Sequence, residues 1–347
     1  LMLLNNYLRL REETLLSVLL IIFSFLVRIP IIIIFGDPTI QNEWEPLLYN
    51  LVNHKTLSFE QFDGFLLPNL LMPPLYAYYL YIFSFFNLED QNFILLILFS
   101  QIVLASISVG VFYKINKLFF SKKISFYSSL LFSLFPIYLY ACSQISSVSL
   151  TIFLALFFYY YFFKLTNSNK FTYIFLFAVI GGLLILLRRE FVIIVILSSF
   201  YLFFYFKMSI KSVLLVLLIS LITISPYLVR NYMIFEKIII HSSFGFNLWK
   251  GNNRNSKVEG SFIVENALQN KINKISKNKF YRINFDKIFL DEAIKNIKET
   301  PGRYLVLYLK RTTSYFFIDL ESSARNYYNP VHYLPIVLLG ITSLIGI

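Results

Sequence analysis

Residues 226–253, PYLVRNYMIFEKIIIHSSFGFNLWKGNN, hold the most informative pattern in the chain. The segment begins at the end of a long apolar run. It then places an Arg-Asn pair, a histidine, two glycines, a tryptophan and several asparagines at one membrane exit. Apolar spans rarely end in so many directional hydrogen-bonding groups, because polar groups beside hydrocarbon must be satisfied. We therefore expect this exit to hold a polar partner at the membrane interface.

The composition around this segment is typical of a multi-pass membrane protein. Hydrophobic residues make up 57% of the 347 positions and charged residues 14%, and the mean hydropathy is +0.66. A soluble domain of this length cannot hide so much apolar surface. Much of the net charge of +12 lies in short gaps between apolar runs, where Lys and Arg orient helices, so we expect no nucleic-acid partner. Cys142 is the only cysteine, which excludes an intrachain disulfide.

Eight apolar runs have the length of a membrane span, since a bilayer core takes roughly 20 residues of helix. They cover residues 14–35, 92–113, 124–141, 147–163, 171–187, 191–206, 212–229 and 331–347. The predicted fold class is therefore an all-α polytopic membrane protein. We expect the first run to be a span rather than a cleavable signal peptide. Because the chain is still apolar at Ile347, we also expect a truncation at this end.

The lysines predict how these spans are oriented. Lysine clusters follow the second, fourth and sixth spans, whereas the gap at 142–146 carries no charge. With a cytoplasmic N-terminus, every lysine cluster falls on the inner face, as the positive-inside rule requires. Segment 72–86 would invert this pattern if it spanned the membrane. Since it is short and begins with two prolines, we interpret it as an interfacial helix.

Two long segments then lie on the outer side, a first loop at 36–92 and a polar region at 230–330. We divide the chain into a transmembrane core at 1–229, which includes the first loop, the polar region, and a final span at 331–347. Leu, Ile and Tyr recur at three- and four-residue spacing in the polar region, which predicts amphipathic helices. Interfacial helices are likewise expected in the first loop. One of these follows Pro38, with one apolar face made by Trp44, Leu47, Leu48 and Leu51.

Few carboxylates are accessible from the outer side. Asp37 follows the first span directly, at the hydrocarbon boundary. Glu43 lies near the start of the helix expected after Pro38, where the helix dipole favours negative charge. Such acids often do no more than solvate a loop. A carboxylate held at the mouth of a span is also placed to act as a base.

Arginines gather on the same side. Arg188 and Arg189 lie in a short turn between two spans, against the positive-inside bias. Glu190 can neutralise one of them, whereas a bound phosphate would use both, because a guanidinium donates two parallel bonds to phosphate oxygens. Arg230 follows the seventh span. Arg28 lies inside the first span, where we expect it to pair with a carboxylate or to reach toward the headgroups.

Four pieces of the sequence, in chain order, carry a family resemblance. They are the acid at 36–37 (GD), the proline–tyrosine segment at 73–76 (PPLY), the turn at 188–191 (RREF), and residues 226–252. They resemble a GT-C membrane glycosyltransferase, in the branch of dolichyl-phosphate-mannose–protein mannosyltransferases and bacterial aminoarabinose transferases (glycosyltransferase family 39). In that family the turn reads Arg-Pro-Glu and the last piece follows an RNY…G-NLW-GN signature. The resemblance covers roughly residues 14–330 and implies a GT-C-like bundle of about eight transmembrane helices.

The resemblance also implies an activity. Such enzymes move a sugar from a polyprenyl-phosphate carrier, with inversion, to a hydroxyl of a lipid, glycan or protein. It therefore implies a hexosyl- or pentosyltransferase among membrane lipids, in a bacterial inner membrane, with its site on the outer face. The implied residues are Asp37 or Glu43 as base, Arg188, Arg189 and Arg230 at the phosphate, and Tyr76, Asn231, Asn247, Trp249 and Asn252 at the substrates. Trp249 is expected either to face a sugar ring or to anchor the chain at the interface.

Two departures from the family pattern bear on the chemistry. The family often has an acid at the start of the fourth span, where this chain has serines at 146, 147 and 149, so we expect no metal or other cofactor there. The family's acid spacing is altered as well, since PTIQN separates Asp37 from the Glu43-Trp44 pair. The identity of the base therefore stays open between Asp37 and Glu43.

Two other functions share part of this pattern. A flippase or exporter of lipid-linked sugars also needs many spans and a basic phosphate site. Transporters, however, usually place ionisable groups near the bilayer midplane and often show repeated halves, and no repeat is visible here. An O-antigen ligase or polymerase with a diphosphate-linked donor would share the arginines.

Overall fold

The structure is a computed structural model that describes residues 2–62, 64–319, 322 and 329–346, without the side chains of 2–12 and 331–332. Within these residues the chain forms fifteen helices and one two-stranded sheet. Part of the predicted polar region, residues 320–321 and 323–328, lies outside the described residues. The chain divides into two compact units, Leu1–Ser58 with Pro73–Met233, and Phe59–Met72 with Ile234–Ile347.

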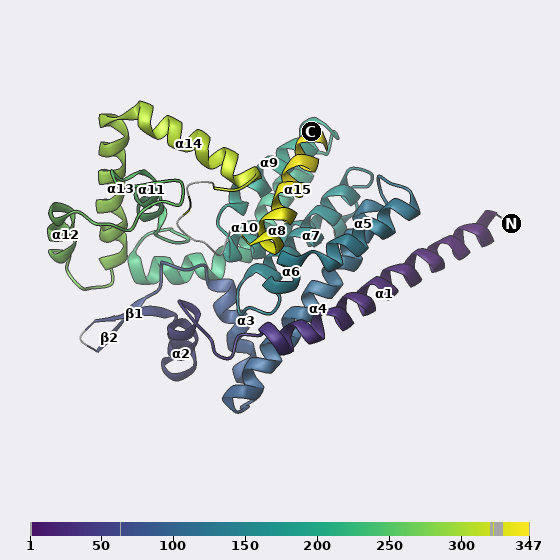
Figure 1. Cartoon of the computed structure of the whole chain (residues 1–347), viewed down its shortest axis with the longest axis horizontal. Helices are drawn as coiled ribbons and strands as arrows, with labels where there is room; N and C mark the ends of the chain where they lie inside the picture. The colour runs from purple at the N-terminus through teal and green to yellow at the C-terminus, as the bar shows by residue number, and fades with distance from the viewer. Residues whose placement is uncertain (1, 63, 320–321, 323–328, 347) are drawn as a thin grey trace. The chain divides into compact units, whose positions relative to one another are not determined.

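The first unit contains most of the apolar helices (Figure 1). Those long and apolar enough to cross a membrane are α1 (Met2–Phe35, apolar from Glu13), α4 (Asp90–Asn116), α7 (Val148–Leu165) and α10 (Ile210–Phe235). Shorter apolar helices are α8 (Phe171–Leu187) and α9 (Phe191–Phe204). The predicted all-α polytopic membrane fold is confirmed.

The third predicted span, 124–141, is not a single helix. Its residues form α5 (Lys122–Leu134) and α6 (Pro136–Ala141), which are separated at Phe135. Pro136 has no N–H to donate, and a proline drives the residue before it out of the helical region. Phe135 accordingly has φ −65° and ψ 119°, which is extended backbone.

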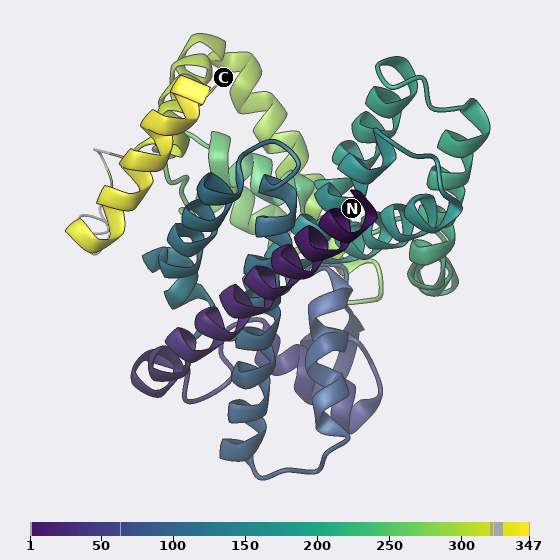
Figure 2. The same cartoon turned by 90° about the vertical axis from the view of Figure 1, so that its right-hand side faces the viewer.

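Helix α4 is central to the first unit and packs against α1, α5 and α7. Figures 1 and 2 both show α1 crossing α4. The two helices approach closely at Gly110, where an added Cβ would lie 2.6 Å from the Cδ1 atom of Ile21. Ser17 donates a hydrogen bond across the same contact to the Gly110 carbonyl, at 3.4 Å.

The first loop forms helices α2 (Trp44–His54) and α3 (Pro74–Ser84), and between them strands β1 (Ser58–Phe62) and β2 (Phe65–Pro68). Helix α2 begins at Trp44 rather than directly after Pro38, and it buries the four apolar residues predicted for its inner face. Helix α3 has 11 residues. At 1.5 Å per residue it is about 16 Å long, too short for a bilayer core of about 30 Å. The sequence pattern did not indicate the small sheet.

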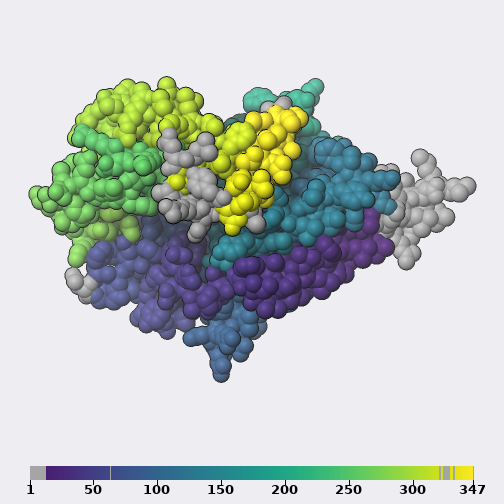
Figure 3. Space-filling view, viewed as in Figure 1, coloured from purple at the N-terminus to yellow at the C-terminus, as the bar shows by residue number. Residues whose placement is uncertain are grey.

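The second unit contains five helices within the described residues. They are α11 (Phe244–Asn252), α12 (Asn266–Asn273), α13 (Tyr281–Glu299), α14 (Pro301–Phe316) and α15 (Pro330–Gly346). Helix α13 packs against α11, α12 and α14, and the surface of these helices is continuous in Figure 3. Their core is formed by Trp249, Leu268, Phe289 and Ala293. An ion pair between Arg282 of α13 and Glu60 of β1 attaches the small sheet to this unit.

Candidate active site

Asp37 lies directly after α1 and is held by the loop between α6 and α7, residues 142–147, which we call the α6–α7 loop. The Asp37 N–H donates to the Ser143 carbonyl at 3.0 Å, and its carboxylate Oδ2 accepts from the Ile145 N–H at 2.6 Å. Gly36 allows the chain to turn here, because a Cβ at Gly36 would lie 2.3 Å from the Ile32 carbonyl oxygen. The carboxylate is therefore fixed at the mouth of the first span, as the sequence predicted.

Gln101 of α4 connects the α6–α7 loop to α3 in the first loop. Its side-chain amide donates to the carbonyls of Gln144, at 2.9 Å, and Cys142, at 3.4 Å, and its oxygen accepts from the Tyr76 hydroxyl at 2.9 Å. Gln101 is only 1% exposed. Gln144 in turn donates to the Phe35 carbonyl at the end of α1, at 2.8 Å. Asp37 and Tyr76 thus belong to one hydrogen-bonded network.

Arg188 reaches the same loop from the end of α8. Its guanidinium donates to the Ser147 hydroxyl at 3.1 Å. The side chain nevertheless stays exposed, and a guanidinium has five N–H donors, so a ligand can still bind to it. The α6–α7 loop therefore carries a carboxylate, Asp37, and an exposed cation, Arg188.

Arg189, the neighbouring arginine, lies in a different environment. The Nε atom of Arg189 lies 3.7 Å from the Glu190 carboxylate, and the Arg189 side chain is 24% exposed. This is the neutralisation that the sequence allowed for one member of the pair. A phosphate contact by Arg189 stays a prediction.

Arg230 and Asn231 form a second cluster at the end of α10. The Arg230 guanidinium donates to Asn231 Oδ1 at 2.7 Å and to the Leu57 carbonyl at 3.1 Å, and it lies 5.6 Å from the ring centre of Tyr227. Asn231 is fully buried. These bonds attach α10 to the residue before β1, whereas Asp37, Tyr76 and Arg188 gather at the α6–α7 loop.

Tyr76 contacts both α2, through Trp44, and α4, through Gln101. Glu43 precedes α2, whose first residue, Trp44, packs edge-on against the Tyr76 ring with centroids 4.7 Å apart. Burial raises the pKa of Tyr76 above its ordinary value, and the neighbouring Tyr79 and Asp37 side chains raise it further, so the hydroxyl is neutral and donates. Tyr76 is 0% exposed. It holds the site together, and its contact with substrate stays a prediction.

The three remaining predicted substrate residues lie on α11, in the second unit. Trp249 is 2% exposed and packs edge-on against Phe289, with ring centroids 4.5 Å apart. Asn252 donates one turn back to the Leu248 carbonyl at 2.8 Å, and the exposed Asn247 donates to Ser243 Oγ at 3.4 Å. Trp249 is thus part of a protein core, a placement that neither expectation for it included.

Arg28 finds a partner different from the one expected. It is 1% exposed within α1 and donates to the carbonyl and the hydroxyl of Ser24. The Cys142 side chain is a further hydrogen-bond partner. Among the described residues, Arg28 therefore pairs with neutral groups rather than with a carboxylate, and it supports the start of the α6–α7 loop.

Sequence reasoning missed Gln101, Gln144 and Ser147, which build the α6–α7 loop into a site. One signal was available, because Gln101 is a lone amide within a strongly apolar run. An amide inside a span needs partners from neighbouring segments. Its actual partners include backbone carbonyls, which leave no mark in a sequence.

Gln101→Leu is expected to destabilise the first unit. The change leaves the Tyr76 hydroxyl and the Gln144 carbonyl without their hydrogen bonds, and each buried polar group left unsatisfied costs about 1–3 kcal/mol. The thermal unfolding midpoint of the purified chain in detergent should therefore fall well below that of wild type. Gln91→Leu, an exposed position on the same helix, is the matched control. Equal midpoints for all three proteins would mean that this network adds nothing to stability.

Comparison with known proteins gives one result. Residues 72–229 match the family model for dolichyl-phosphate-mannose-protein mannosyltransferase. No curated protein matches the chain. The matched region runs from α3 into α10 and includes Gln101, the α6–α7 loop and Arg188. The resemblance is thereby confirmed over residues 72–229, which are similar to the dolichyl-phosphate-mannose-protein mannosyltransferases, a family of GT-C glycosyltransferase-like membrane proteins.

Proposed function

We propose that this protein is an inverting glycosyltransferase that moves a sugar from a polyprenyl-phosphate carrier to a hydroxyl group of a lipid, glycan or protein. One observation carries the proposal: the α6–α7 loop contacts both a carboxylate, Asp37, and an exposed guanidinium, Arg188. A transfer of this kind needs a base for the acceptor and positive charge for the leaving phosphate. The family match includes the α6–α7 loop and Arg188, although Asp37 precedes the matched residues, and it supports the assignment.

The reaction assigns one task to each group. The acceptor oxygen attacks the anomeric carbon, and the bond from that carbon to the phosphate oxygen breaks on the opposite face, which inverts the configuration. Asp37 takes the hydroxyl proton. Its Oδ2 is oriented by the Ile145 N–H, so Oδ1 is the oxygen assigned to the acceptor. Arg188 stabilises the charge that grows on the departing polyprenyl phosphate.

The other assignments are part of the same proposal. Glu43 is the second candidate base, Arg189 and Arg230 are further phosphate ligands, and Asn231 is a substrate contact beside Arg230. We assign the same kind of role to Tyr76, Asn247, Trp249 and Asn252. No metal is needed in this scheme. We place the protein in a bacterial inner membrane, with a cytoplasmic N-terminus and the site on the outer face, because this orientation puts every lysine cluster inside.

Sugar transfer in washed membranes tests the function, with radiolabelled polyprenyl-phosphate sugars as donors and products separated into lipid, glycan and protein fractions. We expect wild type to transfer from at least one donor, and Arg188→Gln to be slower by about a hundredfold or more, because one charge-stabilising donor is lost. Arg188→Lys should recover part of the rate, since it keeps the charge but not the planar fork. Lys211→Gln, an exposed change at the start of α10, is the control.

Two outcomes would contradict this scheme in different ways. Full turnover by Arg188→Gln would remove Arg188 from the phosphate site. No transfer by wild type with any donor would favour a flippase or exporter of lipid-linked sugars. Transfer from diphosphate-linked donors alone would favour the ligase or polymerase reading.

A further inference from the structure

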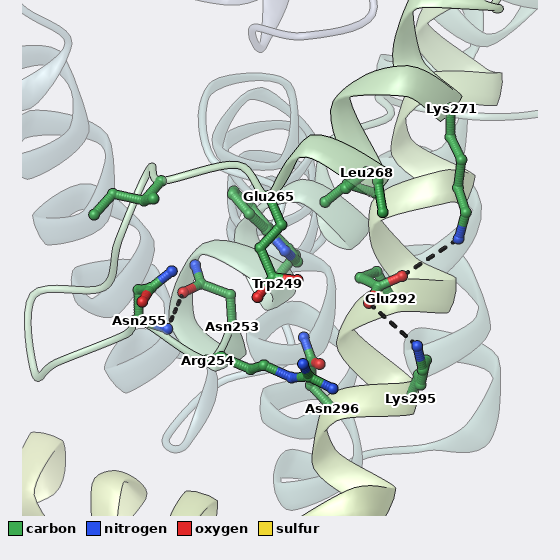
Figure 4. Close-up of a pocket in the computed structure, with 12 residues that line it drawn as sticks. Trp249, Asn253, Arg254, Asn255, Glu265, Leu268, Lys271, Glu292, Lys295 and Asn296 are labelled. Atoms are coloured by element: carbon green, nitrogen blue, oxygen red, sulfur yellow. Dashed lines mark hydrogen bonds and ion pairs between the residues drawn. The ribbon is translucent and has the colours of Figure 1, made fainter.

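The second unit contains a polar pocket of about 100 Å³ (Figure 4). It lies between the turn after α11, the start of α12 and one face of α13. Its apolar lining is made by Trp249, Ile263, Ala267 and Leu268, and Asn253, Glu265, Glu292 and Asn296 are among the polar residues around them. The pocket is built entirely from residues of the second unit, and its lining includes neither Asp37 nor Arg188.

Asn296 gives the first sign that the pocket takes a ligand. The residue is only 4% exposed, and its Oδ1 atom is buried without a hydrogen-bond partner among the described residues. Leaving a buried carbonyl oxygen unsatisfied is unfavourable, and a leucine of similar size would avoid the cost. Because Asn296 lines the pocket, a donor group bound there is placed to satisfy it.

The charges around the pocket indicate what kind of donor this is. Lys271 lies 3.5 Å from Glu292, and Lys295 lies 3.9 Å from the same residue. Arg254 lies 2.9 Å from Glu299. Lys271 and Lys295 share Glu292, and Arg254 pairs with Glu299, so with Glu265 three carboxylates balance the three lining cations and leave no excess positive charge for an anion. This balance favours a neutral ligand.

The remaining features match a sugar. Ring hydroxyls both donate and accept hydrogen bonds. The pocket mixes acceptors, Glu265 and Asn296 Oδ1, with donors from Arg254 and Lys295. The exposed side chains of Ile263 and Ala267 add apolar surface, and apolar side chains supply much of the contact in small-molecule sites. A volume of about 100 Å³ admits the hydroxyl-bearing edge of one ring.

We propose that this pocket binds one neutral sugar unit, with a ring hydroxyl donating to Asn296 Oδ1 and the apolar face of the ring against Ile263 and Ala267. The site goes beyond the proposed transfer reaction. The pocket recognises a saccharide that is bound outside the catalytic site. Binding in the pocket needs no donor lipid. Failure of the transfer assay would therefore leave this proposal standing, and the reverse also holds.

Ligand-observed NMR on the full chain in detergent tests the pocket. The probes are methyl α-mannopyranoside and methyl β-glucopyranoside, with glycerol as a polyol that lacks a ring and inorganic phosphate as an anion. We expect saturable binding of at least one glycoside, and weaker binding, by about tenfold, for Asn296→Leu, which loses a hydrogen bond in the complex. Asn284→Leu, at an exposed position on the same helix, should bind as wild type.

The fold of each variant is checked by its unfolding midpoint. Asn296→Leu should match or exceed wild type, because it removes an unsatisfied buried group. If it fails to fold, Glu265→Gln replaces it. Glu265 is exposed at the start of α12, and its loss should weaken glycoside binding several-fold without loss of fold. Equal glycoside binding by wild type and the folded variant, binding of phosphate or glycerol in place of the glycosides, or no saturable glycoside binding by wild type would each overturn the proposal.

Discussion

Asp37→Asn should abolish sugar transfer while leaving the protein folded. Asparagine keeps a side-chain oxygen that accepts from the Ile145 N–H, and the backbone bond to Ser143 is unchanged. The variant loses the charge that makes the carboxylate a base. General-base catalysis contributes typically 10²–10⁴-fold, so we expect a loss of at least that order.

Three variants are compared with wild type to identify the base. Asp37→Asn tests the first candidate base and Glu43→Gln the second, and Asp90→Asn, an exposed carboxylate at the start of α4, is the matched control. Transfer is measured in washed membranes, and the unfolding midpoint of each purified variant shows whether the fold is kept. Normal turnover by Asp37→Asn together with loss in Glu43→Gln would move the base to Glu43. Equal turnover by all variants would leave neither carboxylate as the base.

Gly245→Ala should disrupt the packing of α11 against α13 in the second unit. A Cβ at Gly245 would lie 2.0 Å from the Asp286 carbonyl oxygen and 2.8 Å from Leu290 Cβ. Because the obstacle is the backbone of α13, no side-chain movement relieves it, and α11 must move away. The hydrogen bond from the Phe246 N–H to Asp286 Oδ1 is then lost, and the contact of Trp249 with Phe289 weakens.

We expect Gly245→Ala to cost about 3 kcal/mol or more, the upper range for an overpacked contact. The gain in helix propensity from Gly to Ala, about 1 kcal/mol, is too small to offset this loss. Limited proteolysis and thermal unfolding of the purified chain measure the effect. Gly302→Ala in α14 is the control, because nothing lies within 4 Å of the added Cβ, and it should leave stability unchanged or raise it. A wild-type proteolysis pattern for Gly245→Ala would show that α11 does not contact α13 so closely.

Much of the local structure could be predicted from the sequence, because it depends on short-range patterns. Trp44, Leu47, Leu48 and Leu51 recur at helical spacing, and α2 buries all four. The break at Pro136 was also readable in the sequence, since a proline disrupts the helix before it wherever the segment lies. We predicted one continuous span at 124–141 because the whole segment is apolar, and we gave the effect of the proline too little weight.

The candidate site, too, has parts that local sequence patterns predict and parts that they do not. Asp37 comes directly after an apolar run, so its place at the mouth of a span could be predicted from neighbouring residues alone. The position of Arg188 beside the same loop could not be predicted in this way, because Arg188 contacts the loop through Ser147, which is 41 positions away in the chain. The partners of Gln101 include backbone carbonyls, which every residue has and no pattern distinguishes.

The sequence by itself therefore determined the membrane class, most of the apolar helices and the nature of the chemical groups, since hydrophobicity, helical period and residue type are local properties. Only the tertiary structure decided which of these groups meet. It placed Asp37, Tyr76 and Arg188 around the α6–α7 loop, buried Trp249 in the core of the second unit, and left Asn296 Oδ1 unpaired in a pocket. Each of these depends on contacts between segments far apart in the chain, whose partners are chosen by packing.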